Sequence, residues 1–69
     1  MRYVVGIFVN RDWVFDGWSS ADGNDAYNKF IEVRSENIKK NDVGLFIDTE
    51  GGYESIELYD SSEDLNQDN

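Results

Sequence analysis

The sequence contains no cysteine, no histidine and no proline. Without cysteine the fold has no disulfide framework and no thiolate metal site. Without histidine it lacks the commonest general base and the commonest zinc ligand. Without proline no turn has its φ angle fixed covalently. A 69-residue domain without these supports must rely on a thin apolar core, to which its aromatic residues, 14% of the chain, contribute most.

Long apolar runs are also missing. No stretch approaches the ~20 apolar residues that a membrane-spanning helix needs. The mostly apolar opening, residues 1–8, is followed by Arg11 and Asp12 rather than by a small-residue cleavage site. It is therefore interpreted as a first strand and not as a signal peptide. These features favour a protein of the cytoplasm, in a cell or in an infected host.

Positive charge is scarce. Lys and Arg number 6 against 15 Asp and Glu, which gives a net charge of −9. DNA, RNA and anionic membranes would repel such a chain, whereas a basic protein surface would attract it. The same charge would also serve solubility alone, or adaptation to a salty habitat.

Four segments have the β-branched and aromatic composition that favours strands. They are residues 3–9, 13–18, 42–48 and 53–60. One helix is predicted between the second and the third, which gives the order ββαββ. We therefore predict an α+β fold, a four-stranded antiparallel sheet with one helix packed on one face, in a single domain of residues 1–60. The polar residues 61–69 are predicted to be a disordered acidic tail.

The helix is predicted from about Asp25 to Lys39, where apolar residues follow i, i+3, i+4 spacing. Asp22 or Asn24 is the expected N-cap, and Asn41 is expected just beyond the C-terminal end. The segment 22–25 also carries oxygen ligands of the kind that calcium takes. It lacks the Asp-x-Asp-x-Asp-Gly pattern and the distant glutamate of a calcium-binding hand, so a helix cap is the favoured interpretation. No metal site and no cofactor is predicted.

The sheet face that the helix leaves open is expected to carry an aromatic patch. Both faces of the strand 3–9 are apolar, so this strand is predicted to be central. The aromatic residues expected on the open face are Phe8, Trp13, Phe15, Phe46 and Tyr59. Exposed patches of this kind usually mark interaction sites. Base stacking on them is discounted, because phosphates would meet a negative field.

Catalysis is not predicted. Without histidine and cysteine, an active site would have to combine carboxylates with Lys, Tyr or Ser. Paired carboxylates need a cleft that separates their pKa values, and a chain of 69 residues has little room for one. The protein is therefore expected not to be an enzyme.

The acidic residues on and near the last two strands suggest mimicry of nucleic acid. They are Asp48, Glu50, Glu54, Glu57 and Asp60. Same-face residues of a strand lie about 6.6–6.8 Å apart, and carboxylates at that step resemble the phosphates of one nucleic-acid strand. The groups with which a DNA-binding enzyme holds phosphates would accept carboxylates as well. Strict alternation places Glu54 and Ile56 on one face of the last strand, and Ser55 and Glu57 on the other.

Glu54-Ser55-Ile56 resembles the Glu-Ser-Ile strand motif of the phage uracil-DNA glycosylase inhibitors, which are small acidic proteins that copy DNA. The resemblance implies that Glu54 and Ser55 take the place of DNA phosphates in the groove of the enzyme. It also implies an apolar pocket, made by a helix on a sheet, that receives an apolar side chain of the enzyme. The helix residues Phe30, Ile31 and Ile38 are the candidate walls of that pocket.

The function predicted from the sequence is a DNA-mimicking inhibitor that binds and blocks a host uracil-DNA glycosylase at its DNA-binding groove. The predicted binding residues are Glu54, Ser55, Ile56, Glu57, Phe30, Ile31 and Ile38. The partner would be a basic DNA-binding enzyme, and neither a nucleic acid nor a membrane. Two alternatives stay open: a phage inhibitor of another nucleic-acid enzyme, such as a CRISPR nuclease or a restriction enzyme, and a non-inhibitory acidic interaction module.

Overall fold

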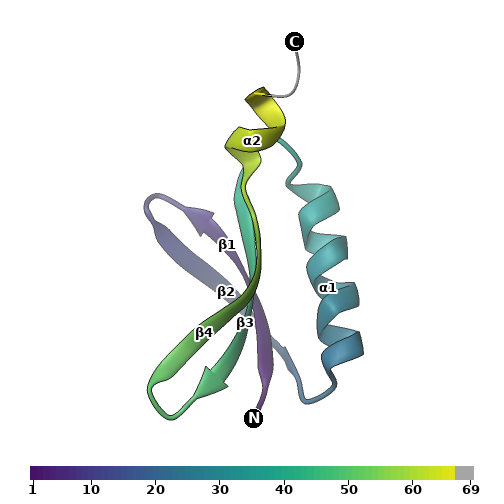
Figure 1. Cartoon of the computed structure of the whole chain (residues 1–69), viewed down its shortest axis with the longest axis vertical. Helices are drawn as coiled ribbons and strands as arrows, with labels where there is room; N and C mark the ends of the chain where they lie inside the picture. The colour runs from purple at the N-terminus through teal and green to yellow at the C-terminus, as the bar shows by residue number, and fades with distance from the viewer. Residues whose placement is uncertain (67–69) are drawn as a thin grey trace.

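The structure is a computed structural model of the chain and describes residues 1–66. Its elements are β1 (Tyr3–Val9), β2 (Asp12–Ser20), α1 (Gly23–Glu36), β3 (Asp42–Thr49), β4 (Gly52–Tyr59) and α2 (Ser61–Asn66). The strands form one antiparallel sheet in the order β2-β1-β3-β4. Helix α1 packs on one face of this sheet (Figure 1). The predicted α+β fold, its ββαββ order and the central position of β1 are confirmed.

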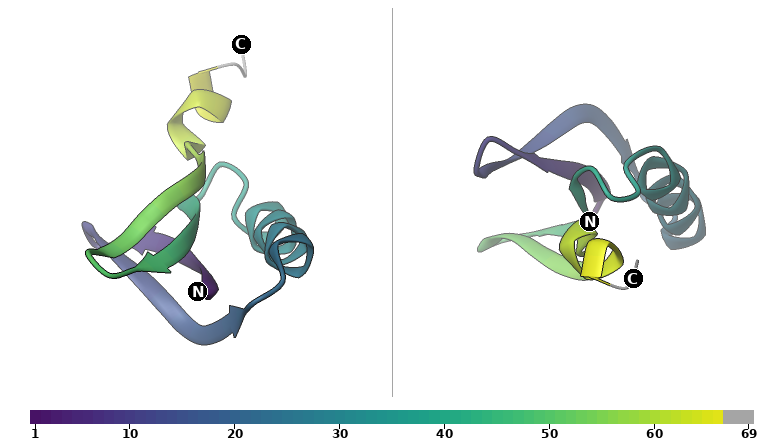
Figure 2. Two further views of the ribbon diagram at one scale, coloured as in Figure 1. Left: turned by 60° about the horizontal axis from the view of Figure 1, so that its bottom comes forward. Right: turned by 90° about the horizontal axis from the view of Figure 1, so that it is seen from above.

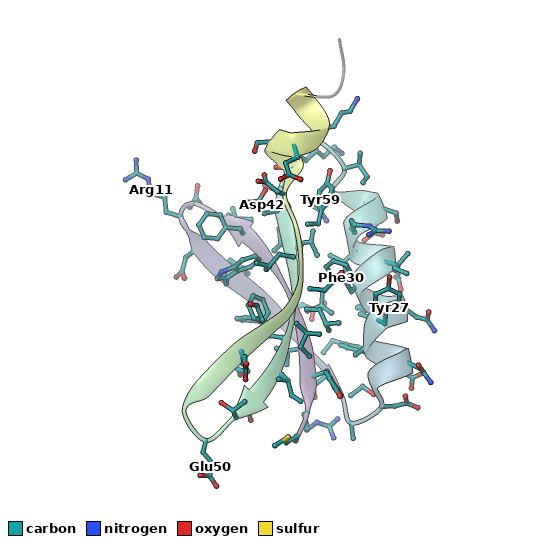
Figure 3. The ribbon with its side chains drawn as sticks, in the orientation of Figure 1. Arg11, Tyr27, Phe30, Asp42, Glu50 and Tyr59 are labelled. Atoms are coloured by element: carbon teal, nitrogen blue, oxygen red, sulfur yellow. The ribbon has the colours of Figure 1, made fainter. Side chains whose placement is uncertain are left out.

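The main core lies between α1 and the sheet. Its buried side chains are Val5, Ala26, Phe30, Val43 and Leu45. Phe30 is 1% exposed and points from α1 toward the strands (Figure 3). Burial of a side chain of this size contributes roughly 1.5–3 kcal/mol, so these few residues fix the helix on the sheet.

Helix α1 begins at an aspartate cap, as predicted. The Asp22 carboxylate accepts a hydrogen bond from the Asn24 N–H at 2.8 Å, and the Asp22 carbonyl accepts one from the Ala26 N–H at 3.0 Å. The segment 22–25, which was considered as a calcium site, therefore forms the N-terminal cap of α1. Within residues 1–66, neither helix is long and apolar enough to cross a membrane.

The C-terminal end of α1 was predicted too late in the chain. The helix ends at Glu36, because the Asn37 side-chain amide donates to the Val33 carbonyl at 2.8 Å and caps the last turn. Lys39 then adopts a left-handed conformation with φ of 61° and turns the chain away. Asn41, expected just beyond the helix, instead donates from its side chain to Asn37 Oδ1 at 3.1 Å.

The sheet face opposite α1 is strongly curled. Gly6 of β1 and Gly44 of β3 pair with each other at the centre of the sheet. Aromatic rings lie directly above them: a Cβ atom on Gly6 would stand 2.7 Å from the Phe15 ring, and one on Gly44 would stand 2.6 Å from the Phe46 ring. The two hairpins diverge on the side away from α1 (Figure 2), and the rings occupy the space between them.

Five side chains form an aromatic cluster on this curled face, each in ring contact with at least one other: Phe8, Trp13, Phe46, Phe15 and Tyr53. Phe15 and Tyr53 come from opposite edge strands, yet their ring centroids are 5.4 Å apart. A flat sheet would separate these strands by about 14 Å. Phe46, in the middle of the cluster, is only 7% exposed. The expected aromatic patch is therefore partly a second, smaller core.

A bulge in β4 alters which of its residues share a face. Leu45 pairs with Glu57, whereas the next residue, Phe46, pairs with Ser55, so Ile56 is the extra residue. Beyond a bulge of one residue, each side chain points to the face opposite to the one that strict alternation predicts.

The prediction that Tyr59 belongs to the open aromatic face was wrong for this reason. Tyr59 lies after the bulge and packs against the main core, and its hydroxyl accepts a hydrogen bond from the Lys39 N–H at 3.0 Å. Tyr53, which lies before the bulge and was not predicted in the patch, stacks on Phe15.

The segment predicted to be a disordered tail begins as a helix. The Asp42 carboxylate accepts hydrogen bonds from the Ser61 N–H at 2.9 Å and from the Ser61 hydroxyl at 2.8 Å. These bonds tie the first residue of α2 to the start of β3. The prediction of a disordered tail considered only the polar composition, whereas residues 61–66 form α2 in the structure; residues 67–69 lie outside the described residues.

Replacing Gly44 with alanine is expected to lower the free energy of unfolding by about 1–3 kcal/mol, because the new methyl group would overlap the closely packed Phe46 ring. Gly51→Ala is the matched control, since a Cβ atom there meets nothing within 4 Å, and it should change stability by less than about 0.5 kcal/mol. Urea denaturation measures both. Equal effects of the two substitutions would contradict a packed aromatic cluster.

Candidate protein-binding surface

The charge of the chain divides at residue 41. Residues 1–40 hold six acidic and six basic residues, whereas residues 41–69 hold nine acidic residues and none that is basic. The entire net charge of −9 therefore belongs to the hairpin β3–β4, to α2 and to the residues that follow. The sequence-based interpretation noted the acidic residues near the last two strands but not that basic residues are missing from this half of the chain. Counting charges along the sequence would have revealed the boundary.

Six acidic residues flank or line the hairpin: Asp42, Asp48, Glu50, Glu54, Glu57 and Asp60. Glu50 projects from the tip of the hairpin, and Asp42 lies at its other end, near α2 (Figure 3). All of them are exposed except Asp42, which is half-buried. Carboxylates of one sign along a single hairpin produce a concentrated negative potential.

The bulge at Ile56 places Glu54 and Glu57 on one face of β4, where strict alternation had predicted opposite faces. Glu54 pairs with Ile47 and Glu57 pairs with Leu45. Because these partners are two residues apart on β3, the two glutamates are separated by one strand repeat of about 6.6–6.8 Å. This is the step at which carboxylates resemble successive phosphates of one nucleic-acid strand.

The motif Glu54-Ser55-Ile56 lies on an edge strand, since β4 is the outermost strand of the sheet. All three residues and Glu57 are exposed. Ser55 pairs with Phe46, on the face of the aromatic cluster, so Glu54 and Ser55 point to opposite sides of the sheet.

The three helix-side residues predicted with them are placed elsewhere. Phe30 is buried in the main core, Ile31 is half-buried against that core, and Ile38 is exposed beyond the end of α1. Helix α1 packs on β1, β2 and β3. No pocket is found in the described part of the chain. The structure thus brings the β4 residues together but does not join them with the three helix-side residues in one site.

Two exposed apolar residues of β4 were not predicted as part of the surface. Tyr53 and Leu58 are each 59% exposed. Both lie on the face of the aromatic cluster, where Tyr53 stacks on Phe15 and Leu58 pairs with Gly44. Leu58 was missed because strict alternation, which takes no account of the bulge, assigned it to the face of Glu54.

Asp60 fixes the end of the acidic hairpin. Its carboxylate accepts hydrogen bonds from the Ser62 hydroxyl at 2.6 Å and from the Ser62 N–H at 2.9 Å. These bonds hold the pKa of Asp60 below its ordinary value, and the bond from the Ser62 hydroxyl has the largest effect. Among residues 1–66, no three carboxylates come together in a way that would hold a metal ion.

Ser62→Ala is expected to raise the pKa of Asp60, because it removes the strongest of these hydrogen bonds. Asp60 directly precedes α2, and its charged carboxylate binds the first turn of that helix. Because its pKa is lower in the folded state than in the unfolded state, this interaction stabilises the fold at pH values above the unfolded-state pKa. That contribution is lost as the pH falls through the lowered folded pKa. An NMR titration of the Asp60 carboxyl carbon measures the pKa. Ser61→Ala, whose hydroxyl bonds Asp42, should leave it unchanged; a pKa that is the same with and without the Ser62 hydroxyl would show that the cap does not form.

Comparison of the chain with protein-family models, with curated proteins and with solved structures finds no match in any of the three. The likeness to uracil-DNA glycosylase inhibitors therefore rests on Glu54-Ser55-Ile56 and stays a prediction. The functional argument depends on three features of the surface of this chain. Strand β4 is an edge strand, the hairpin β3–β4 carries only acidic charged residues, and Glu54 and Glu57 are separated by one strand repeat.

Proposed function

We propose that the protein is a DNA-mimicking inhibitor that binds a basic DNA-binding enzyme through the hairpin β3–β4, and that this enzyme is a uracil-DNA glycosylase. The observation that carries the proposal is the division of charge, since nine acidic and no basic residues follow residue 40. A charge that served solubility alone would have no reason to be confined to the part of the chain after residue 40.

The half of the chain that is electrically neutral supplies most of the fold. Residues 1–40 contain β1, β2 and α1, and they contribute Val5, Ala26 and Phe30 to the main core. The acidic half supplies the exposed edge. A partner is therefore expected to meet the hairpin β3–β4.

Glu54 and Glu57 are the residues proposed to stand for two successive phosphates. They share a face at one strand repeat, and both are exposed. An enzyme that holds phosphates with Arg, Lys, Ser and backbone N–H groups can bind a carboxylate with the same donors. The long-range field of the hairpin would speed the encounter, and that effect weakens as salt screens the charges.

The choice of uracil-DNA glycosylase rests on Glu54-Ser55-Ile56, whereas the division of charge fits any basic nucleic-acid enzyme. The pocket that accompanied this resemblance is left out of the proposal, since no pocket is found among residues 1–66. The proposed contact is made by the hairpin β3–β4, with Glu54 and Glu57 of β4 as its acidic residues.

One equivalent of the protein is expected to stop a bacterial uracil-DNA glycosylase from excising uracil from duplex DNA. The double substitution Glu54→Gln with Glu57→Gln should weaken inhibition by roughly tenfold at low salt, as two contacts of about 0.7 kcal/mol each would give. The matched control is Glu32→Gln with Glu36→Gln, which removes the same charge from exposed positions of α1 and should change inhibition by less than about twofold. Full enzyme activity at tenfold excess of the protein would exclude this target.

The wider proposal is tested by immobilising the protein and the two doubly substituted variants and passing bacterial lysate over each. We expect the wild type and the α1 control to retain a basic nucleic-acid enzyme that duplex DNA elutes, and the β4 variant to retain much less of it. Mass spectrometry identifies the enzyme. Retention that is insensitive to both DNA and the β4 glutamates would contradict the decoy function.

A further inference from the structure

Strand β4 is an open edge of the sheet. Within residues 1–66 it is paired only with β3, and seven of its eight residues are exposed, Tyr59 being half-buried. Helix α1 packs on the other three strands, and α2 begins only after β4 has ended. An edge strand presents backbone N–H and C=O groups that are ready to pair with another strand.

The opposite edge, β2, is interrupted. Between the pairs Gly6↔Phe15 and Val4↔Ser19, β2 has three residues where β1 has one. Within this bulge Gly17 has φ of 90°, and the Asp16 carboxylate accepts the Trp18 N–H at 2.9 Å. A bulge of this size prevents continuous pairing, whereas the bulge of β4 at Ile56 adds a single residue, so β4 is the better edge for an added strand.

The composition of β4 is unusual for an unprotected edge. Tyr53 and Leu58 are prominently exposed, as described above, and Ile56 is 49% exposed. Natural edges are commonly protected by lysine or proline, and β4 contains neither. Its only charged residues are Glu54 and Glu57, which lie between the apolar positions.

These glutamates select the partner. Two copies of β4 paired edge to edge would bring the negatively charged glutamates of both copies together, and like charges on neighbouring strands destabilise pairing. Each copy would also carry its own net charge of −9. A segment that bears lysine or arginine on one face would instead place opposite charges beside Glu54 and Glu57.

We propose that β4 docks an extended basic segment of its protein partner, which adds to the sheet as a fifth strand. Backbone pairing along β4 supplies affinity, Glu54 and Glu57 select basic side chains on one face, and Tyr53 and Leu58 contact the side chains on the other. This mode of binding rests on the proposed function in one respect: the partner is a basic protein.

The test uses a synthetic ten-residue peptide of alternating lysine and valine as the probe, with ¹⁵N-labelled protein. Addition of the peptide should slow amide hydrogen exchange in β4 and shift its resonances, while β2 is little affected. A second peptide with proline in place of every valine keeps the five positive charges but cannot form a regular strand. It should bind at least tenfold more weakly. Glu54→Gln with Glu57→Gln should weaken binding of the first peptide, and Glu32→Gln with Glu36→Gln should not.

Equal binding of the two peptides, changes centred on β2, or no binding of the first peptide at 1 mM (about −4.1 kcal/mol) would each overturn strand addition at β4. A dimer of the free protein that protects β4 from exchange would overturn it as well, because the occupant would then be a second copy. The outcomes are separable from those of the enzyme assay. Inhibition of the glycosylase together with equal peptide binding would leave the decoy function standing without strand addition, whereas selective peptide binding without inhibition would leave the docking edge standing without that target.

Discussion

The pair of glycines at the centre of the sheet, Gly6 and Gly44, leaves room for aromatic rings against the backbone. With side chains at these positions, Phe15 and Phe46 would be pushed outward, and the two hairpins could not curl around a shared cluster. Because they do curl, residues from the two edge strands meet, as Phe15 and Tyr53 do. A short chain thereby acquires apolar packing on both faces of its sheet. That second layer compensates for the absence of disulfides, on which domains of this size commonly depend.

The order of elements followed from local pattern. Alternating and β-branched runs marked the strands, and the two apolar faces of residues 3–9 marked a central one, because a strand needs apolar residues on both sides only when both sides are covered. The Asp22 cap was equally predictable, since a short acidic side chain before an apolar-periodic segment satisfies free N–H groups of the first turn. These features depend on residues that are close in sequence.

The features that were missed depend on contacts between distant residues. The bulge at Ile56 exists only relative to the register of β3, and no local property of residues 53–60 locates it. One extra residue was enough to move Tyr59 from the aromatic face to the main core and to bring Glu54 and Glu57 onto one face. The order of α2 depends likewise on Asp42, nineteen positions before Ser61. The division of charge at residue 41 is different in kind, because it was visible in the sequence and needed only a running count.

Confinement of the excess negative charge to the part of the chain after residue 40 gives the molecule a large electric dipole moment in addition to its net charge. The neutral half lies around α1 and the β1–β2 hairpin, and the negative half lies along β3–β4 and α2. In the field of a cationic surface, such a body experiences a torque as well as an attraction. It would rotate during approach, so that β4 and the hairpin tip with Glu50 arrive first and α1 trails behind. Orientation of this kind raises the fraction of collisions that are productive, and a uniformly charged domain of the same net charge would not have it.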